Sequence, residues 1–139
     1  MILIHASGLI AALDESQPQH LVAADALRRS GTPRLLSPFV LAELDYLLAN
    51  RVSASVARSL VQEVADGAYQ LEPFDNDDVA AAIEIMNRLP GVDLGLADAS
   101  IVVLAERHGV RDVLTLDERH FRVMRAPGGR PFRILPADS

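Results

Sequence analysis

Residues 1–14, MILIHASGLIAALD, join two apolar runs through a short polar break. Met1–Ile4 is an unbroken apolar run of strand length, and Leu9–Leu13 is a second apolar run. The break is His5, followed by two small residues. This pattern predicts a buried strand that ends where a helix begins. Because α/β proteins usually place their chemistry at this edge, the imidazole of His5 is a candidate functional group.

The alternation of strand and helix continues to the end of the chain. Short apolar segments are separated by longer segments with helical periodicity, an order that predicts a parallel sheet flanked by helices. The capping residues Ser37 (followed by a proline), Ser53, Asp75 and Asp93 mark helix starts. We therefore predict an α/β fold, with one domain over residues 1–139. The expected strands are Met1–His5, Arg34–Ser37, Tyr69–Pro73, Asp112–Leu116 and Phe132–Leu135.

The composition excludes several classes of protein. The chain has 139 residues, no cysteine, no lysine and a net charge of −6. Without cysteine there is no disulfide framework and no thiolate metal site, and no segment is apolar for long enough to span a membrane. The absence of lysine and of a G-x-G-x-x-G loop excludes phosphate-loop and dinucleotide-binding proteins. We expect a cytoplasmic protein that does not bind membranes.

Two carboxylates stand at positions where helical periodicity predicts burial. Glu43 shares a helical stripe with Val40 and Leu44, and Asp98 has apolar neighbours three and four residues away in the segment DLGLADASIVVLAERHG. An ionised carboxylate buried in this way needs a cation, a metal or a raised pKa. A third acid, Asp117, follows the apolar strand-like stretch DVLTL and so lies at the carboxyl end of a strand.

Each of these residues taken alone also has a purely structural interpretation. Asp117 can cap a short helix, and Asp93 fits a helix cap better than a ligand. Glu43 and Asp98 can each pair with an arginine, and His5 can be a hydrogen-bonded core histidine. The joint pattern favours convergence at the carboxyl edge of the sheet. Carboxylates that converge repel one another, and a divalent cation such as Mg²⁺ or Mn²⁺ resolves that repulsion.

Three segments, in this order, resemble the PIN-domain family, and within it the small VapC-like toxins of toxin–antitoxin pairs. MILIHASGLIAALD (1–14) is similar to the opening strand and helix, LLSPFVLAELDYLL (35–48) to the second acidic segment, and GLADASIVVLAERHGVRDVLTLDERHF (95–121) to the third and fourth. The resemblance implies a three-layer α/β/α sandwich around a parallel sheet, usually in a homodimer. It also implies metal-dependent endoribonuclease activity, with RNA as substrate and a VapB-like antitoxin as protein partner.

The resemblance can be carried over to individual residues. The metal ligands that it implies are acids, and the implied cofactor is Mg²⁺ or Mn²⁺. The matching residues are Glu43, Asp98 and Asp117 for the second, third and fourth acids, Ser7 for the small hydroxyl residue after the first acid, and, as weaker matches, Thr115 for a polar position beside the site and Asp93 for an accessory acid.

Position 5 departs from the family pattern. The pattern has an aspartate there, in a D-x-S arrangement, whereas this chain has His5, Ala6 and Ser7. Histidine removes a negative charge and a hard oxygen and offers a softer nitrogen, so Mg²⁺ should bind less well, while Mn²⁺ or Zn²⁺ should lose less affinity. One base change converts an Asp codon to a His codon, and a ribonuclease toxin harms its expression host. His5 therefore admits three interpretations: a working variant, a natural loss of activity, and a selected or engineered inactivating change.

In the active form, the resemblance implies one or two Mg²⁺ ions that activate a water for attack on an RNA phosphodiester. Ser7 would position a carboxylate or the water. Seven of the thirteen arginines lie from Arg107 onward, and Arg119 is the candidate phosphate clamp, because a guanidinium can hold phosphate through two hydrogen bonds. A surface role fits Arg119 equally well. The competing class is a catalytically silent binding module that holds an antitoxin or a second copy of itself, using a groove formed by the helical residues 38–50 and 53–67.

Overall fold

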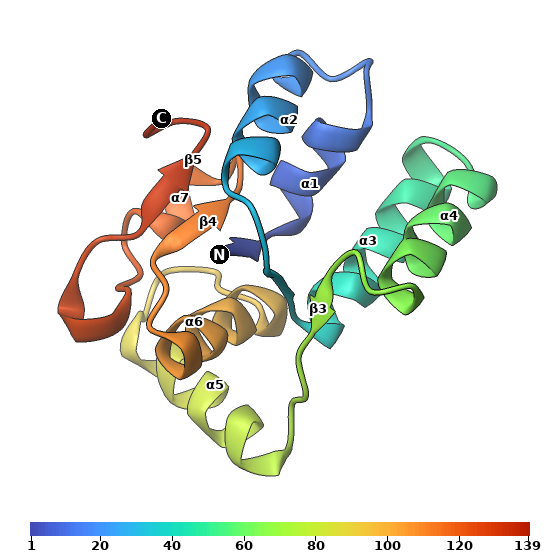
Figure 1. Ribbon diagram of the computed structural model, residues 1–139. Helices are drawn as coiled ribbons and strands as arrows, with labels where there is room; N and C mark the ends of the chain where they lie inside the picture. The colour runs from blue at the N-terminus through green and yellow to red at the C-terminus, as the bar shows by residue number, and fades with distance from the viewer.

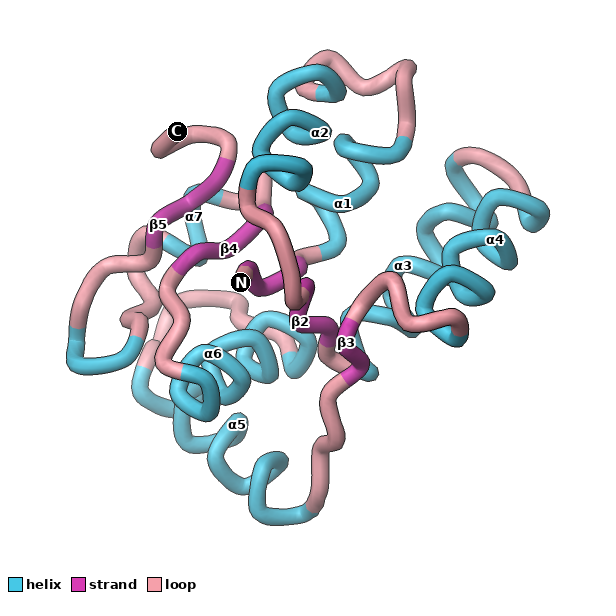
Figure 2. The backbone as a smooth tube through the Cα atoms, viewed as in Figure 1, coloured by secondary structure: helices cyan, strands magenta, loops and turns pink.

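A five-stranded parallel sheet forms the centre of the computed structural model, which describes residues 1–139 (Figure 1). The strand order is β3-β2-β1-β4-β5, so the N-terminal strand lies in the middle of the sheet (Figure 2). In the register, Leu3 pairs with Leu35 on one side and with Val113 on the other. All five expected strands are confirmed. They are β1 (Ile2–Ile4), β2 (Arg34–Leu36), β3 (Gln70–Leu71), β4 (Asp112–Leu114) and β5 (Arg133–Leu135).

Helices cover both faces of the sheet, which confirms the predicted three-layer α/β/α arrangement. In Figure 1, α1 and α2 pack together above the sheet and α5 and α6 pack together below it, while the pair α3 and α4 projects to one side. No helix combines the length and the apolar composition that a membrane-spanning segment requires. The helices are α1 (Ala6–Leu13), α2 (His20–Arg29), α3 (Pro38–Arg51), α4 (Ala54–Ala65), α5 (Asn76–Arg88), α6 (Leu96–His108), α7 (Glu118–Phe121) and the short 3₁₀ helix η1 (Pro127–Gly129).

The central strand is buried on both faces. Ile2, Leu3 and Ile4 are at most 1% exposed, which explains why this strand is an unbroken apolar run instead of an alternating one. Helix α1 packs very closely on β4, because a Cβ atom added at Gly8 would lie 2.4 Å from the carbonyl oxygen of Leu114. Only a residue without a side chain permits this approach, and it holds the start of α1 against the carboxyl end of β4.

Three of the four predicted helix caps are confirmed. The side chains of Ser37, Ser53 and Asp75 accept hydrogen bonds from backbone N–H groups in the first turns of α3, α4 and α5. The prediction that Asp93 caps a helix is wrong, because α6 begins after Gly95, whose N-cap position has no side-chain hydrogen bond. The buried side chain of Leu94 lies between them, and Asp93 itself is exposed.

Candidate metal centre

His5 lies at the point where β1 ends and α1 begins. It is the N-cap residue of α1, with an extended backbone, and is only 7% exposed. Its backbone N–H donates to the carbonyl oxygen of Leu114 at 3.1 Å, and its ring stands edge-on to Phe121 with the two ring centroids 5.2 Å apart. The imidazole is therefore fixed between the central strand and the segment that follows β4.

Two hydroxyl groups hold one side of the His5 ring. The Nδ1 atom of His5 lies 2.7 Å from Thr115 Oγ1 and 2.9 Å from Ser7 Oγ. The hydroxyls are themselves fixed by the backbone, because Leu116 N–H donates to Ser7 Oγ and Asp117 N–H donates to Thr115 Oγ1, each at 2.9 Å. Ser7 and Thr115 thus orient the ring of His5 and tie the end of β1 to the end of β4.

Two carboxylates lie on the other side of the His5 ring. Asp98, in the first turn of α6, has its Oδ1 atom 2.9 Å from His5 Nε2. Asp117 caps α7, since its Oδ1 atom accepts the N–H of His120 at 3.1 Å. Ligand atoms from His5, Asp98 and Asp117 all lie within 4.8 Å of one another. The capping role of Asp117 and its place in this cluster therefore exist together.

His120 joins the two carboxylates, and the sequence analysis did not single it out. Its Nδ1 atom lies 2.8 Å from Asp117 Oδ2 and 3.4 Å from Asp98 Oδ2, while its Nε2 atom is buried without a hydrogen-bond partner. The available signal was its position three residues after Asp117, which places both side chains on the same side of a helical turn. With Nε2 unpartnered, we assign the proton to Nδ1, where it donates to Asp117.

The short helix that carries His120 is anchored by the C-terminal segment. Arg122 donates to both carboxylate oxygens of Asp138, at 2.7 and 2.9 Å, and to Glu118 at 2.8 Å. The hydrogen bonds from Arg122 and from the backbone N–H of Ile134 hold the pKa of Asp138 below its ordinary value. These contacts fix α7, and with it the carboxylate of Asp117, relative to β5.

The electrostatics of the cluster suit a cation. Two carboxylates face each other across a partly buried site, with Asp98 and Asp117 exposing 15% and 25% of their side chains. The start of α6 favours the negative charge of Asp98 through its backbone N–H groups. One nitrogen and two carboxylate ligands fit a divalent ion, so His5, Asp98 and Asp117 form a group that can hold a metal.

The structure does not bring every predicted residue into this group. Glu43 is half-buried on α3, with no hydrogen bond or ion pair, and is absent from the cluster of ligand atoms. Asp93 is exposed and also lies outside the cluster. Arg119 is exposed on α7, two residues after Asp117, with no ion pair. Its side chain is therefore open to solvent and unpaired.

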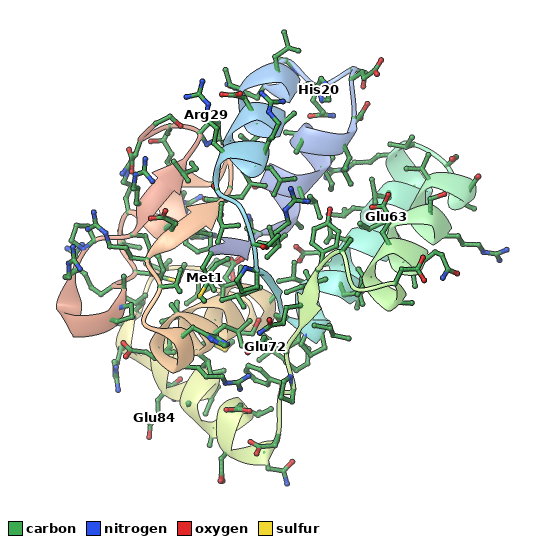
Figure 3. All side chains as sticks on the ribbon, viewed as in Figure 1. Met1, His20, Arg29, Glu63, Glu72 and Glu84 are labelled. Atoms are coloured by element: carbon green, nitrogen blue, oxygen red, sulfur yellow. The ribbon has the colours of Figure 1, made fainter.

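A buried acid, Glu72, lies away from this cluster. Glu72 directly follows β3 (Figure 3), is 6% exposed, and contacts His108 and Arg107 at the end of α6. Burial raises the pKa of Glu72, but hydrogen bonds from His108 and Gln70 outweigh this effect, and the pKa lies below its ordinary value. This group joins β3 to α6, and the sequence analysis missed it because its partners are far apart in the chain.

The chain is similar to a known protein family and to a ribonuclease of Mycobacterium tuberculosis. The family model described as PIN domain matches residues 2–126. Ribonuclease VapC26 of Mycobacterium tuberculosis (strain ATCC 25618 / H37Rv) is 36% identical over 135 residues, which cover 97% of this chain and 100% of that protein.

Two solved structures have a similar fold. The Mycobacterium tuberculosis toxin VapC20, which cleaves the sarcin-ricin loop, matches with a TM-score of 0.79 and 18% identity over 86% of this chain and 92% of that chain. VapBC2 from Rickettsia felis, bound to a DNA fragment from their promoter, matches with a TM-score of 0.52 and 18% identity over 78% of this chain and 83% of that chain. At these identities, the likeness concerns the fold.

Proposed function

The chain belongs to the PIN-domain family, and from this premise we propose that it is an endoribonuclease toxin of the VapC type that depends on a divalent metal. The observation that carries the proposal is the convergence of His5, Asp98 and Asp117 at the carboxyl edge of the sheet. Each stands at a position where the family pattern has an acid of the active site. The similarity to Ribonuclease VapC26 over almost the whole chain supports the same activity.

We assign separate tasks to the residues of the site. Asp98 and Asp117 would hold the cation, with position 5 as the third ligand, and Ser7 and Thr115 would orient the side chain at position 5. When bound, Mg²⁺ or Mn²⁺ supplies an activated water for attack on a phosphodiester and stabilises the leaving oxygen. Arg119, which is exposed and follows Asp117 by two residues, is suited to hold a substrate phosphate. Glu43 lies outside the cluster and is proposed only as a ligand for a second ion or for a water shell.

We further propose an RNA substrate and a VapB-like antitoxin as partners. The chain carries a net charge of −6, so RNA is best recognised locally, through the metal and nearby arginines, instead of by a general positive field. Aromatic residues make up 4% of the chain, which disfavours a broad stacking platform for single strands. The likeness to VapBC2 supports an antitoxin partner. A homodimer and a cytoplasmic location belong to the same proposal.

A second candidate, a silent PIN-fold binding module, is favoured by one specific observation. Both ring nitrogens of His5 already have hydrogen-bond partners, one on the hydroxyls and one on Asp98. The imidazole can thus satisfy the site without a metal, which would leave binding of an antitoxin or of a second copy as the remaining task.

Cleavage of a structured RNA pool tests the proposed function. In a His5→Asp background, which restores the family ligand, we expect cleavage with Mg²⁺ or Mn²⁺ and none with EDTA. Adding Asp98→Asn should reduce the rate by about 100-fold or more, because it removes a ligand charge. The matched control is Asp77→Asn, since Asp77 also lies in the first turn of a helix but is exposed and outside the cluster. Equal loss in the two variants, or cleavage in EDTA, would contradict the proposal.

A further inference from the structure

We propose that His5 converts this centre from a magnesium site into a mixed nitrogen and oxygen site that selects Zn²⁺ over Mg²⁺, an inference that rests on the function proposed above. His5, Asp98 and Asp117 would hold the ion, and zinc sites with three protein ligands commonly also bind a water or a substrate oxygen. His120 positions the two carboxylates.

The donor atoms present do not suit Mg²⁺. This ion demands oxygen ligands in a near-ideal octahedron, which carboxylates and waters supply, whereas the third ligand of this cluster is the imidazole nitrogen of His5. The carboxylate of Glu43, which could have added a further oxygen, lies outside the group. Zn²⁺ accepts imidazole nitrogen together with carboxylate oxygen, and its catalytic sites commonly have three protein ligands and one open position. The group of one histidine and two aspartates has this composition.

The orientation of His5 also fits a ligand. Histidines that bind metals usually donate their other ring N–H to a nearby acceptor, which fixes the tautomer. Thr115 Oγ1 lies 2.7 Å from Nδ1 of His5 and can accept that proton. Nε2 then presents its lone pair toward Asp98 Oδ1, 2.9 Å away. A proton on Nε2 bridges these two atoms when no metal is bound. Zn²⁺, which binds imidazole nitrogen and carboxylate oxygen at about 2.0 to 2.2 Å each, can displace that proton and bind both atoms from one side.

His120 contacts both carboxylates and holds them close together. Its Nδ1 atom faces Asp117 Oδ2 at 2.8 Å and Asp98 Oδ2 at 3.4 Å, which leaves the Oδ1 atom of Asp98 turned toward His5. This is the arrangement of an outer partner that orients a ligating carboxylate, and loss of such partners typically costs about 10- to 100-fold in metal affinity.

Titration calorimetry of the full chain, with Zn²⁺ and Mg²⁺ each used alone, tests the inference. We expect one Zn²⁺ per chain, and we expect His5→Asp to lower the ratio of the Mg²⁺ dissociation constant to the Zn²⁺ dissociation constant by at least about tenfold. His5→Asn, which removes the imidazole without adding a charge, should also weaken Zn²⁺ binding. His120→Gln should weaken it by about tenfold while thermal unfolding stays cooperative.

His20→Gln is the matched control. His20 begins α2 (Figure 3), and its Nδ1 atom lies 2.9 Å from the carbonyl oxygen of Ala11, outside the cluster. This variant should leave Zn²⁺ binding unchanged. Nitrogen-15 spectra of the imidazoles give an independent readout, because Zn²⁺ should shift the Nε2 resonance of His5 and leave that of His20 in place.

Two results would overturn the inference. One is a dissociation-constant ratio that His5→Asp leaves unchanged, and the other is Zn²⁺ binding that survives in His5→Asn but is lost in His108→Gln, which would place the ion beside Glu72. Failure of the ribonuclease proposal is seen separately. If the folded His5→Asp protein binds Mg²⁺ but cleaves no RNA, the function is wrong, whereas cleavage by His5→Asp with an unchanged ratio refutes only the zinc preference.

Discussion

Replacing Gly8 with alanine should disrupt the contact between α1 and β4 that supports the candidate site. The added Cβ would lie 2.4 Å from the carbonyl oxygen of Leu114 and 2.6 Å from the backbone nitrogen of Thr115. Because these are backbone atoms of a central strand, they cannot turn aside as a side chain would. Ordinary van der Waals contact begins at 3.4 Å, so α1 would have to move away from β4 by about 1 Å.

The loss in the free energy of unfolding can be worked out from the contacts that this movement strains or breaks. Overpacking of this kind costs about 1 to 3 kcal/mol. The movement also lengthens the hydrogen bonds from His5 N to Leu114 O and from His5 Nδ1 to Thr115 Oγ1, each worth about 1 kcal/mol. Alanine returns about 1 kcal/mol through its better helix propensity. We expect a net loss of about 3 kcal/mol in the free energy of unfolding.

Urea unfolding followed by circular dichroism measures this loss. Gly95→Ala is the control, because Gly95 has a negative φ of −84° and no atom within 4 Å of an added Cβ. Alanine is a poorer N-cap than glycine, so this control should lose less than about 1 kcal/mol. If Gly8→Ala is as stable as the unmodified protein, the close packing of α1 on β4 is wrong, and so is the argument that it fixes His5.

Three further predictions concern other parts of the molecule. The pKa of Glu72 in the folded protein lies below its ordinary value of 4.5, so ionised Glu72 stabilises the fold at pH values above 4.5. This stabilisation is lost as the pH falls through the folded pKa. The melting temperature should therefore drop less steeply below pH 4.5 in Glu72→Gln than in the unmodified protein. Ser37→Ala should cost about 1 to 2 kcal/mol in urea unfolding, since Ser37 caps α3 and accepts a buried hydrogen bond from Ser100 at 2.6 Å; a cost near zero would contradict this role. Arg119→Ala should weaken RNA binding in gel-shift titrations without changing the melting temperature, and unaltered RNA affinity would remove Arg119 from the proposed site.

The site residues that follow strands could be predicted from the sequence, because all parallel sheets share the geometry that places them. Parallel strands place their carboxyl ends at the same edge, so His5 after β1 and Asp117 after β4 were expected to lie close together. Asp98 joined them because its apolar neighbours fixed the face of α6 that packs on the sheet. The pattern alone left a structural interpretation open for each of these residues, and their assignment to one site rested on the resemblance to the PIN-domain family.

Glu43 shows where periodicity alone is insufficient. The helical periodicity correctly predicted that Val40 and Leu44 are buried. It does not predict the direction in which α3 leaves the sheet. In the folded protein, Glu43 is half-buried and is not among the three clustered ligands. The position of Glu43 depends on how α3 packs in the folded protein, which the local sequence pattern does not determine.

His120 and Glu72 depended on contacts that no local pattern contains. Helix α7 has four residues, too few for a periodic signal, and the partnership of His120 with Asp98 joins positions far apart in the sequence. Glu72 follows a two-residue strand and meets His108 only because α6 crosses back toward β3, 36 residues later. Both are nonlocal pairs, which composition and spacing do not determine.

A comparison of this protein with His5→Asp on a structured RNA pool shows whether the cluster is a metal-dependent ribonuclease site. The two proteins would be used at equal concentration with Mg²⁺, with Mn²⁺ and with EDTA, after circular dichroism has established that both are folded. We expect that His5→Asp cleaves RNA with Mg²⁺, that the His5 protein cleaves at least about tenfold more slowly under the same conditions, and that EDTA stops both. Absence of cleavage by folded His5→Asp with either ion would contradict the claim that His5, Asp98 and Asp117 mark a metal-dependent ribonuclease site.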